Sequence, residues 1–380
     1  MKRNKKLTLL ILLALMMVLC LCLFTACQNE KWDLNEHPNT PPELDLVGKG
    51  VELLYKWIGS YGWTVVVFTV LLKLIMTPLD FWQRFSAKKQ AVKTQEMQPI
   101  IESIDKRYGA NSQKGNEEKQ KLYKKQGVSM FSTCLPLIAS MVIFFVMWGG
   151  LNSYSSRINV QNYLDLHDAY VTEYDRVASE HKGEPIEDYN QEAITKAKDA
   201  VVKRYNTDVQ QGWLWIKNVW RPDTWEKVML DYTAFTNGSM GTVGVILDSK
   251  DGEAIYKNIY DAVISDYDGW NGYMILPILS VALSFFSMWL TQRMDKKKVD
   301  GKVVKDTSQN AASNKMMMII MPLMMAYFGF IYTGAFAIYM VFSSLIGLLT
   351  TVALKKPIDI AVAKSIAKSA QSQPKASYKR

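Results

Sequence analysis

The chain has 380 residues, of which 49% are hydrophobic and 21% charged, and its formal net charge at pH 7 is +9. This length fits one large or two ordinary domains, and a positive charge of this size suits anionic lipid or nucleic acid as a partner. The apolar residues fall in long runs with the charges between them, which favours the membrane and argues against DNA.

Cysteine and histidine usage excludes two further kinds of site. Cys20, Cys22 and Cys27 lie in the N-terminal apolar stretch and Cys134 in a later apolar run, so no disulfide framework is expected. The three histidines form no HExxH motif and the cysteines no CxxC pair. No metal site and no cofactor are therefore predicted.

The N-terminus has the features of a secretory signal. A basic start is followed by an apolar run, 7–24, and then by Thr25, Ala26 and Cys27, an order typical of signal peptides. A cysteine directly after two small residues resembles a bacterial lipobox. Residues 1–26 are therefore predicted to be a lipoprotein signal peptide, and Cys27 to carry lipid of the palmitate type. The alternative is an uncleaved membrane anchor with an incidental cysteine.

Residues 27–56 predict an extracytoplasmic linker that ends in an amphipathic stretch. After this linker, five apolar runs predict five membrane-spanning helices. About 20 apolar residues are needed to cross a bilayer, and four runs reach that length while the fourth in order is slightly shorter and uncharged. Only Thr333 and Gly334 separate the last two runs, which predicts a tight helical hairpin. The five predicted spans are 57–76, 130–151, 273–292, 316–332 and 335–354.

The density of lysine and arginine predicts the orientation. Segment 77–129 contains 11 of these residues, 293–315 contains 7 and the tail 355–380 contains 7, whereas the long segment 152–272 contains 12 against 20 Asp and Glu. With five spans the three basic segments share one side, which is predicted to be cytoplasmic. The protein is thus expected to be multi-pass in a bacterial cell membrane, with its C-terminus cytoplasmic and its N-terminus and the 152–272 insertion outside.

Two of these connecting segments have internal structure. In 77–129, apolar residues recur at helical spacing up to Tyr108, residues 109–112 break the pattern, and 116–126 form a charged helical stretch. This predicts a helical hairpin at the cytoplasmic surface, with either a docking role or the role of a solvated linker on anionic lipid. In the outer insertion, 171–179 and 192–205 are predicted helices.

Four tryptophans of the outer insertion lie close together in the sequence. They surround Ile216 and Val219, and we expect them to form an aromatic cluster at the outer membrane–water interface. They are Trp213, Trp215, Trp220 and Trp225.

Several short stretches, taken in order, resemble the YidC family of membrane protein insertases. They are TVLLKLIMTPL at 69–79, QPI at 98–100, LYK at 122–124, CLPL at 134–137, LWI at 214–216, ILPIL at 275–279, TQ at 291–292, TG at 333–334 and Tyr339. The resemblance covers residues 50 to about 357, apart from the stretches 153–211 and 225–270 of the outer insertion, which are far longer than is usual in the family. It implies an all-α polytopic membrane protein of the Gram-positive, lipoprotein-signal-bearing type. Lys73 stands where the family usually has arginine.

Lys73 is the residue that most needs an explanation, because a charge in hydrocarbon costs about 2.5–3.5 kcal/mol on insertion scales. Thr69 and Thr77 lie one turn before and one turn after it on the same helix face. This polar stripe predicts a hydrated groove for substrate. The alternative is snorkelling of the lysine stem to the interface, which the tilt of helical side chains toward the N-terminus opposes.

The family resemblance adds Gln292 and Tyr339 to the border of this groove. The resemblance implies a membrane protein insertase and chaperone that inserts and helps fold integral membrane proteins through the groove without chemistry. No P-loop or other nucleotide motif is present, so the protein is not expected to be an enzyme. The expected partners are nascent or newly made membrane proteins and membrane lipid, with the ribosome and the Sec translocon as further candidates.

Two functions from other classes remain open at this point. A small-anion transporter or channel would use Lys73 as its binding charge, although such proteins usually carry internal repeats and none is found here. A lipid-anchored adhesion or scaffold protein would act through 152–272, although the polar features lie inside the predicted spans.

Overall fold

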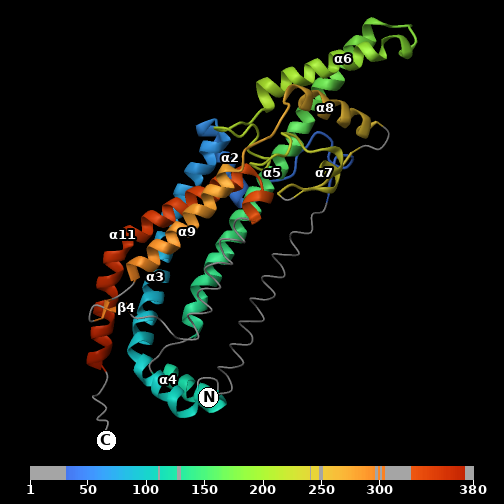
Figure 1. Cartoon of the computed structure of the whole chain (residues 1–380). Helices are drawn as coiled ribbons and strands as arrows, with labels where there is room; N and C mark the ends of the chain where they lie inside the picture. Colours follow the sequence, from blue (N-terminus) through green and yellow to red (C-terminus); the bar gives the residue numbers. More distant parts are fainter. Residues whose placement is uncertain are drawn as a thin grey trace, which may run out of the picture. The chain divides into compact units, whose positions relative to one another are not determined.

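The computed structural model describes residues 31–109, 112–125, 130–239, 241–247, 251–295, 298–299, 302–303 and 327–372. The chain is mostly helical (Figure 1). It divides into two compact units: the first contains 1–68, 145–284 and 306–341, and the second contains 69–144, 285–305 and 342–380. The predicted signal peptide, Cys27 and most of the span 316–332 lie outside the described residues.

A break at Gly59 separates two helices where the sequence predicts the start of one span. Helix α2, Leu46–Ile58, begins after Asp45, whose side chain accepts a hydrogen bond from the Gly48 amide at 2.6 Å. Gly59 ends this helix at a φ of 70°, a conformation that glycine adopts without steric cost. Helix α3 begins at Tyr61. The predicted span 57–76 therefore does not coincide with one helix, and Trp57 lies in α2.

Helix α3, Tyr61–Tyr108, runs on from the apolar stretch into the predicted hairpin, with Pro78 and Pro99 inside it. Gly109, at a φ of 85°, follows its last turn. The second arm of the hairpin is α4, Gln113–Lys125. Lys119 of α4 and Asp105 of α3 form an ion pair that joins the two arms.

Helix α5, Met130–Glu180, is 51 residues long and continues from the second predicted span into the outer insertion. No proline lies between Pro136 and Pro185 to interrupt it. The helix predicted at 171–179 is therefore the end of α5 rather than a separate element. The helix predicted at 192–205 lies in α6, Ile186–Arg204, and in the first residue of the π-helical turn η1, Tyr205–Val209.

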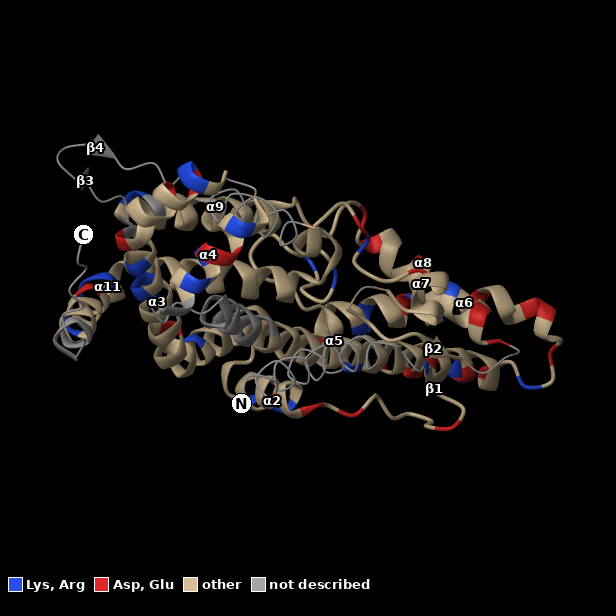
Figure 2. Ribbon diagram, turned by 90° about the horizontal axis from the view of Figure 1, so that it is seen from below, with Lys and Arg blue, Asp and Glu red and all other residues tan. Residues whose placement is uncertain are grey.

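The rest of the outer insertion packs against the second half of α5 (Figure 1). Its elements are α7, Tyr232–Asn237, and α8, Gly252–Asp266, and β2, Val245–Ile246, pairs in parallel with β1, Trp32–Asp33. Their shared core includes Tyr163, Leu166, Val201, Phe235, Tyr256 and Ile259. Figure 2 shows acidic residues along α6 and α8, as the composition of the insertion predicts.

The predicted tryptophan cluster divides in the structure into buried and exposed members. Trp220 is buried beside Tyr61 and Tyr154, with ring centroids 5.2 Å from each. Trp213 is buried and lies edge-on to Trp63 at 5.7 Å. Trp225 is exposed. The two buried tryptophans thus join the outer insertion to the first turns of α3 and to α5.

The later helices also extend beyond the predicted spans. Helix α9 is Ile275–Asp295, and α11 is Gly334–Ser372, which continues past the predicted end at 354 with Pro357 inside it. Strands β3, Lys298–Val299, and β4, Lys302–Val303, form an antiparallel pair after α9. Among the described residues, Tyr61–Thr94 and Gly334–Ala367 are long and apolar enough to cross a membrane, and Ile275–Thr291 is a shorter apolar helix.

Close packing at Gly62 provides a test of how the outer insertion is joined to α3. A Cβ atom added at Gly62 would lie 2.1 Å from Cγ of Trp213. We expect Gly62→Ala to lower the free energy of unfolding by about 1–3 kcal/mol, because the buried indole must move. The measurement is the thermal unfolding midpoint of the purified protein in detergent.

Gly149→Ala is the matched control, since Gly149 is also helical and a Cβ there meets no atom within 4 Å. Alanine should stabilise that position by up to about 1 kcal/mol. Equal midpoints for the two variants would contradict the packing of Trp213 on α3.

Candidate functional site

The polar stripe predicted on the first span lies on one face of α3. Thr69 is fully buried, and Lys73 and Thr77 are half-buried. The Thr77 hydroxyl donates a hydrogen bond to the carbonyl oxygen of Lys73 at 2.8 Å. The exposed residues of the same stretch are all apolar: Val67, Val70, Leu71, Leu74 and Ile75. The helix therefore presents an apolar surface outward and turns its polar stripe toward the protein.

This stripe is longer than the sequence analysis predicted. Asp80, Arg84 and Lys88 follow Thr77 at spacings of three and four residues, which keeps them on the same helix face. Asp80 and Arg84 are the charged groups that act electrostatically on Lys73. The uninterrupted course of α3 from Tyr61 to Tyr108 brings the six residues into one line.

The far end of the stripe is bonded to α11 within the second unit. Nη1 of Arg84 donates to Oγ1 of Thr351 at 2.6 Å, and Nη2 donates to the carbonyl oxygen of Gly347 at 3.4 Å. Lys88 forms an ion pair with Asp359. These contacts are not predictable from the sequence, because partners some 260 to 270 residues apart share no local pattern.

Of the other predicted site residues, the structure describes the side chain of Tyr339 but not those of Gln292 and Cys27. Tyr339 is buried in α11, with its ring centroid 6.0 Å from that of Phe336, and it belongs to the first unit. Gln292 lies in α9, but its side chain is outside the described residues, as is all of Cys27. The structure thus brings Thr69, Lys73 and Thr77 together on one face.

Several hydroxyl groups of α9 bond to their own helix. Ser280 donates to the carbonyl oxygen of Pro277, Ser284 to that of Ser280 and Thr291 to that of Ser287, each at 2.8 Å. Ser280 is buried. Such bonds satisfy the hydroxyl protons inside the helix, which favours a structural role for these three residues over a role in lining a groove.

A second polar centre, which the sequence analysis did not identify, is the carboxylate of Asp223. Its side chain is 0% exposed. It accepts hydrogen bonds from Nε1 of Trp215 at 3.2 Å, from the Tyr273 amide at 2.9 Å and from the Leu276 amide at 2.8 Å. Because Leu276 lies in the first turn of α9, Asp223 caps this helix from 52 residues before its first residue and complements its dipole.

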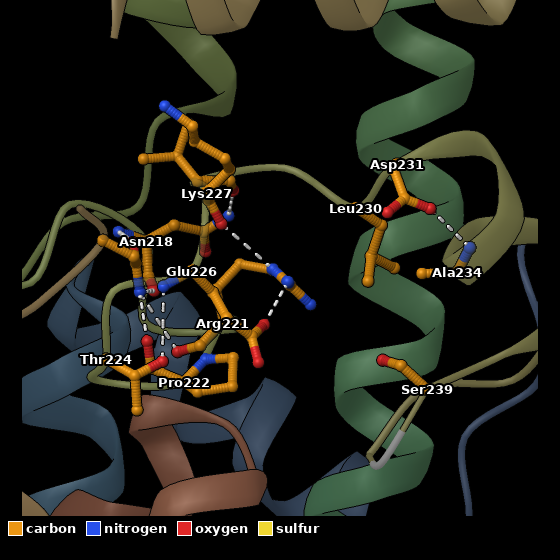
Figure 3. Close-up of polar contacts among 12 residues, drawn as sticks. Asn218, Arg221, Pro222, Thr224, Glu226, Lys227, Leu230, Asp231, Ala234 and Ser239 are labelled. Atoms are coloured by element: carbon orange, nitrogen blue, oxygen red, sulfur yellow. Dashed lines mark hydrogen bonds and ion pairs between the residues drawn. The ribbon is translucent and has the colours of Figure 1, made fainter. Parts of the chain in front are cut away.

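Arg221 and two asparagines complete this centre, and Figure 3 shows the contacts of Arg221. Its Nε donates to the carbonyl oxygen of Lys227 at 3.2 Å, and its Nη2 bonds to Glu226. Burial lowers the pKa of the Arg221 guanidinium, and the negative charge of Glu226 acts in the opposite sense. Asn271 donates to the carbonyl oxygen of Pro222 at 2.8 Å, and Asn218 to that of Val228 at 2.8 Å.

Backbone bonds tie the same loop to the start of α11. The Gly334 amide donates to the carbonyl oxygen of Arg221 at 2.8 Å, and the Ala335 amide donates to that of Val219 at 2.7 Å. These amides lie at a helix N-terminus, where no partner is available within the helix. One loop, 218–223, therefore bonds to the first turns of both α9 and α11.

The described residues offer binding and positioning rather than covalent chemistry. No group of three or more His, Cys, Asp or Glu side chains in the described ranges could hold a metal ion. What they do provide is a half-buried ammonium group on a polar stripe, with an exposed apolar surface on the other side of the same helix. This arrangement can attract an acidic or polar segment next to lipid.

Comparison with known proteins identifies a family. The family model described as 60Kd inner membrane protein matches residues 53–361. A membrane protein insertase YidC from Caldanaerobacter subterraneus is 30% identical over 121 residues, which cover 32% of this chain and 56% of that protein. Proteins of the same name from Campylobacter jejuni and Stenotrophomonas maltophilia are 33% and 34% identical over 98 and 109 residues, covering 26% and 28% of this chain and 18% of each relative. The matched regions thus span from about a fifth to about half of these relatives' lengths.

Replacement of the buried carboxylate tests the Asp223 centre. Asp223→Asn keeps one acceptor oxygen but turns an NH2 group toward backbone amides, so we expect the free energy of unfolding to fall by about 1.5–3 kcal/mol. The readout is thermal unfolding in detergent, with protease sensitivity of the outer insertion as a second measurement.

Asp231→Asn is the control for the loss of a carboxylate. Asp231 is exposed and caps α7 through the Ala234 amide at 2.8 Å (Figure 3), and asparagine caps helices about as well as aspartate. This variant should unfold like the wild type. If Asp223→Asn did the same, the hydrogen bonds of Asp223 would contribute little to stability.

Proposed function

Since the chain belongs to the 60Kd inner membrane protein family, we propose that it is a membrane protein insertase that brings integral membrane proteins into a bacterial membrane and helps them fold there. The observation that carries this proposal is the half-buried Lys73 on the inward polar stripe of α3. The relatives named above are called insertases. No bond is made or broken in this function.

The mechanism follows from the cost of moving polar groups into hydrocarbon. A hydrated groove beside Lys73 lowers that cost for a polar substrate segment, and the ammonium group attracts the segment when it is acidic. The apolar helix of the substrate then passes into lipid, driven by hydrophobic transfer of about 25 cal/mol per Å². Gln292 and Tyr339 border the groove in this proposal, on the strength of the family resemblance alone.

The small-anion transporter or channel is not supported by the comparisons, because each relative described above is named an insertase. The adhesion or scaffold function has no observation in its favour either. The tight bonding of loop 218–223 to α9 and α11 instead suits a structural role for this part of the outer insertion.

The proposed topology has five spans, with the hairpin 77–129 and the C-terminus in the cytoplasm and the insertion 152–272 outside. Its support is the concentration of lysine and arginine in 77–129, 293–315 and 355–380. Nascent membrane proteins would then meet the hairpin first. The ribosome and the Sec translocon are the candidate partners for their delivery on this side.

The proposed N-terminus is a lipid-modified Cys27 exposed outside after removal of 1–26. Its support is the order of a basic start, an apolar run and a cysteine after two small residues. Such a lipid chain would add a second anchor to the spans.

Lys73 can be tested in cells depleted of the protein, with insertion of a single-span reporter as the readout. Wild type and Lys73→Arg should restore insertion, because both keep the positive charge. Lys73→Ala should lower it about tenfold, equivalent to about 1.4 kcal/mol, and Lys73→Glu should lower it further for a reporter with an acidic outer segment.

Lys106→Ala is the matched control, because Lys106 is an exposed lysine on the same helix and should complement fully. Insertion that continues unchanged after depletion would overturn the insertase proposal. Full complementation by both Lys73→Ala and Lys73→Glu would remove the charge from the mechanism.

The lipid anchor can be tested by intact-mass measurement of the purified protein. The wild type should lack residues 1–26 and carry the added mass of acyl chains, whereas Cys27→Ser should lack the acyl mass and keep its signal segment. Cys22→Ser should behave as wild type. A wild-type mass equal to that of the unmodified 380-residue chain would contradict the lipobox.

A further inference from the structure

A tight turn in the outer insertion holds an apolar residue where glycine is favoured. Trp213 and Ile216 exchange two backbone hydrogen bonds of 2.9 Å, so Leu214 and Trp215 are the two central residues of the turn. Leu214 has a φ of 53°, a left-handed conformation that is unusual for a residue with a side chain and that glycine favours at the first position of such turns. Its side chain is nonetheless 66% exposed. Strain of this kind often marks a functional position.

The position of the turn is fixed by its neighbours in the first unit. Trp213 packs against Gly62 and Trp63 in the first turn of α3, the helix whose stretch 61–94 is long and apolar enough to cross a membrane. Nε1 of Trp215 is bonded to Asp223, which also accepts from the Tyr273 amide at the start of α9. Leu214 therefore lies in a turn that is held beside the starts of two apolar helices.

Further exposed aromatic side chains surround the same helix ends. Trp63, Trp225, Trp270 and Tyr273 are each at least half exposed. Tryptophan and tyrosine are enriched where a protein crosses the membrane–water boundary. In α9, Ile278 and Leu279 are also exposed apolar residues. Lys217 directly follows the turn, and its charge suits the phosphate level of the headgroups.

We propose that the turn 213–216 inserts into the outer leaflet, with Leu214 in the acyl chains just below the headgroups and Trp225 and Trp270 beside it at the headgroup level. The partner is lipid, since the turn contacts the start of α3 and is linked through Asp223 to the start of α9, and both helices carry exposed apolar side chains. The strained backbone holds the leucine in the position that reaches the acyl chains. This role requires α3 to cross the membrane, but it does not depend on insertase activity.

The test measures the depth of position 214 directly. A fluorescent amino acid replaces Leu214 in the full chain, and the protein is reconstituted into phosphatidylcholine–phosphatidylglycerol vesicles with lipids brominated near the glycerol or near the chain end. We expect quenching at position 214 to exceed that at the control position at least fivefold, and to be stronger with the shallow bromines than with the deep ones.

Ile186 provides the matched control position. It is 62% exposed in the same unit. It lies beyond the end of α5, where the 30 residues from Leu151 to Glu180 extend the helix by roughly 45 Å. A probe there should not be quenched. Equal quenching at the two positions, or quenching at 214 by neither lipid, would overturn the proposal. If the fluorescence of a probe at position 214 changed only when a substrate protein was added, the turn would contact substrate and not lipid, which would also overturn the proposal.

Leu214→Gly gives a second, independent readout without a probe. Glycine adopts the left-handed conformation without strain. If Leu214 faces lipid, the unfolding midpoint of Leu214→Gly in detergent should therefore be equal to or above that of the wild type. A clear fall in the midpoint would show that Leu214 packs within the protein, and would overturn its assignment to lipid.

Discussion

The buried carboxylate of Asp223 is the interaction on which the arrangement of the outer insertion depends. A buried charge is tolerated only when hydrogen bonds replace the water it has lost, and Asp223 receives them from Trp215, Tyr273 and Leu276. The same loop supplies the carbonyl groups that bond to the first amides of α11. Helices that enter a bilayer cannot leave such amides without partners near the apolar region, so loop 218–223 satisfies the ends of α9 and α11 together.

The fixed helix ends next to loop 218–223 have a consequence for the rest of α3. Its first turn is held by Trp213 and by the ring of Tyr61 against Trp220. Lys73 lies twelve residues further, roughly 18 Å along the helix axis. The stripe thus begins within the apolar part of α3 and ends at Arg84 and Lys88, whose partners on α11 fix its other end. Between these two ends no break in the helix interrupts the polar face.

Local pattern in the sequence predicted the features that depend on neighbours along the chain. The spans follow from the length of the apolar runs, the hairpin break at 109–112 from turn-forming residues, and the Thr69–Lys73–Thr77 stripe from a period of four residues. The helix boundaries were less predictable, because hydropathy marks the apolar stretch while α3, α5 and α11 continue far beyond it. The Asp223 centre was not predictable at all, since its amide partners lie about 50 residues away. Gly59 is a local sign of the break before α3, because glycine commonly ends helices. The hydropathy pattern alone does not show this break.

The lysine at position 73 limits the kind of contact that the polar stripe can make with a substrate. Arginine offers a planar fork of five donors, whereas lysine offers a compact charge with three. The Thr77 hydroxyl donates its proton to the carbonyl oxygen of Lys73. The hydroxyl oxygen of Thr77 can still accept a hydrogen bond from water or from a substrate amide. A stripe built in this way attracts by charge and hydration, and it does not depend on the geometry of one bidentate contact. Such a surface would discriminate little between substrate sequences, which is what the proposed insertase function requires.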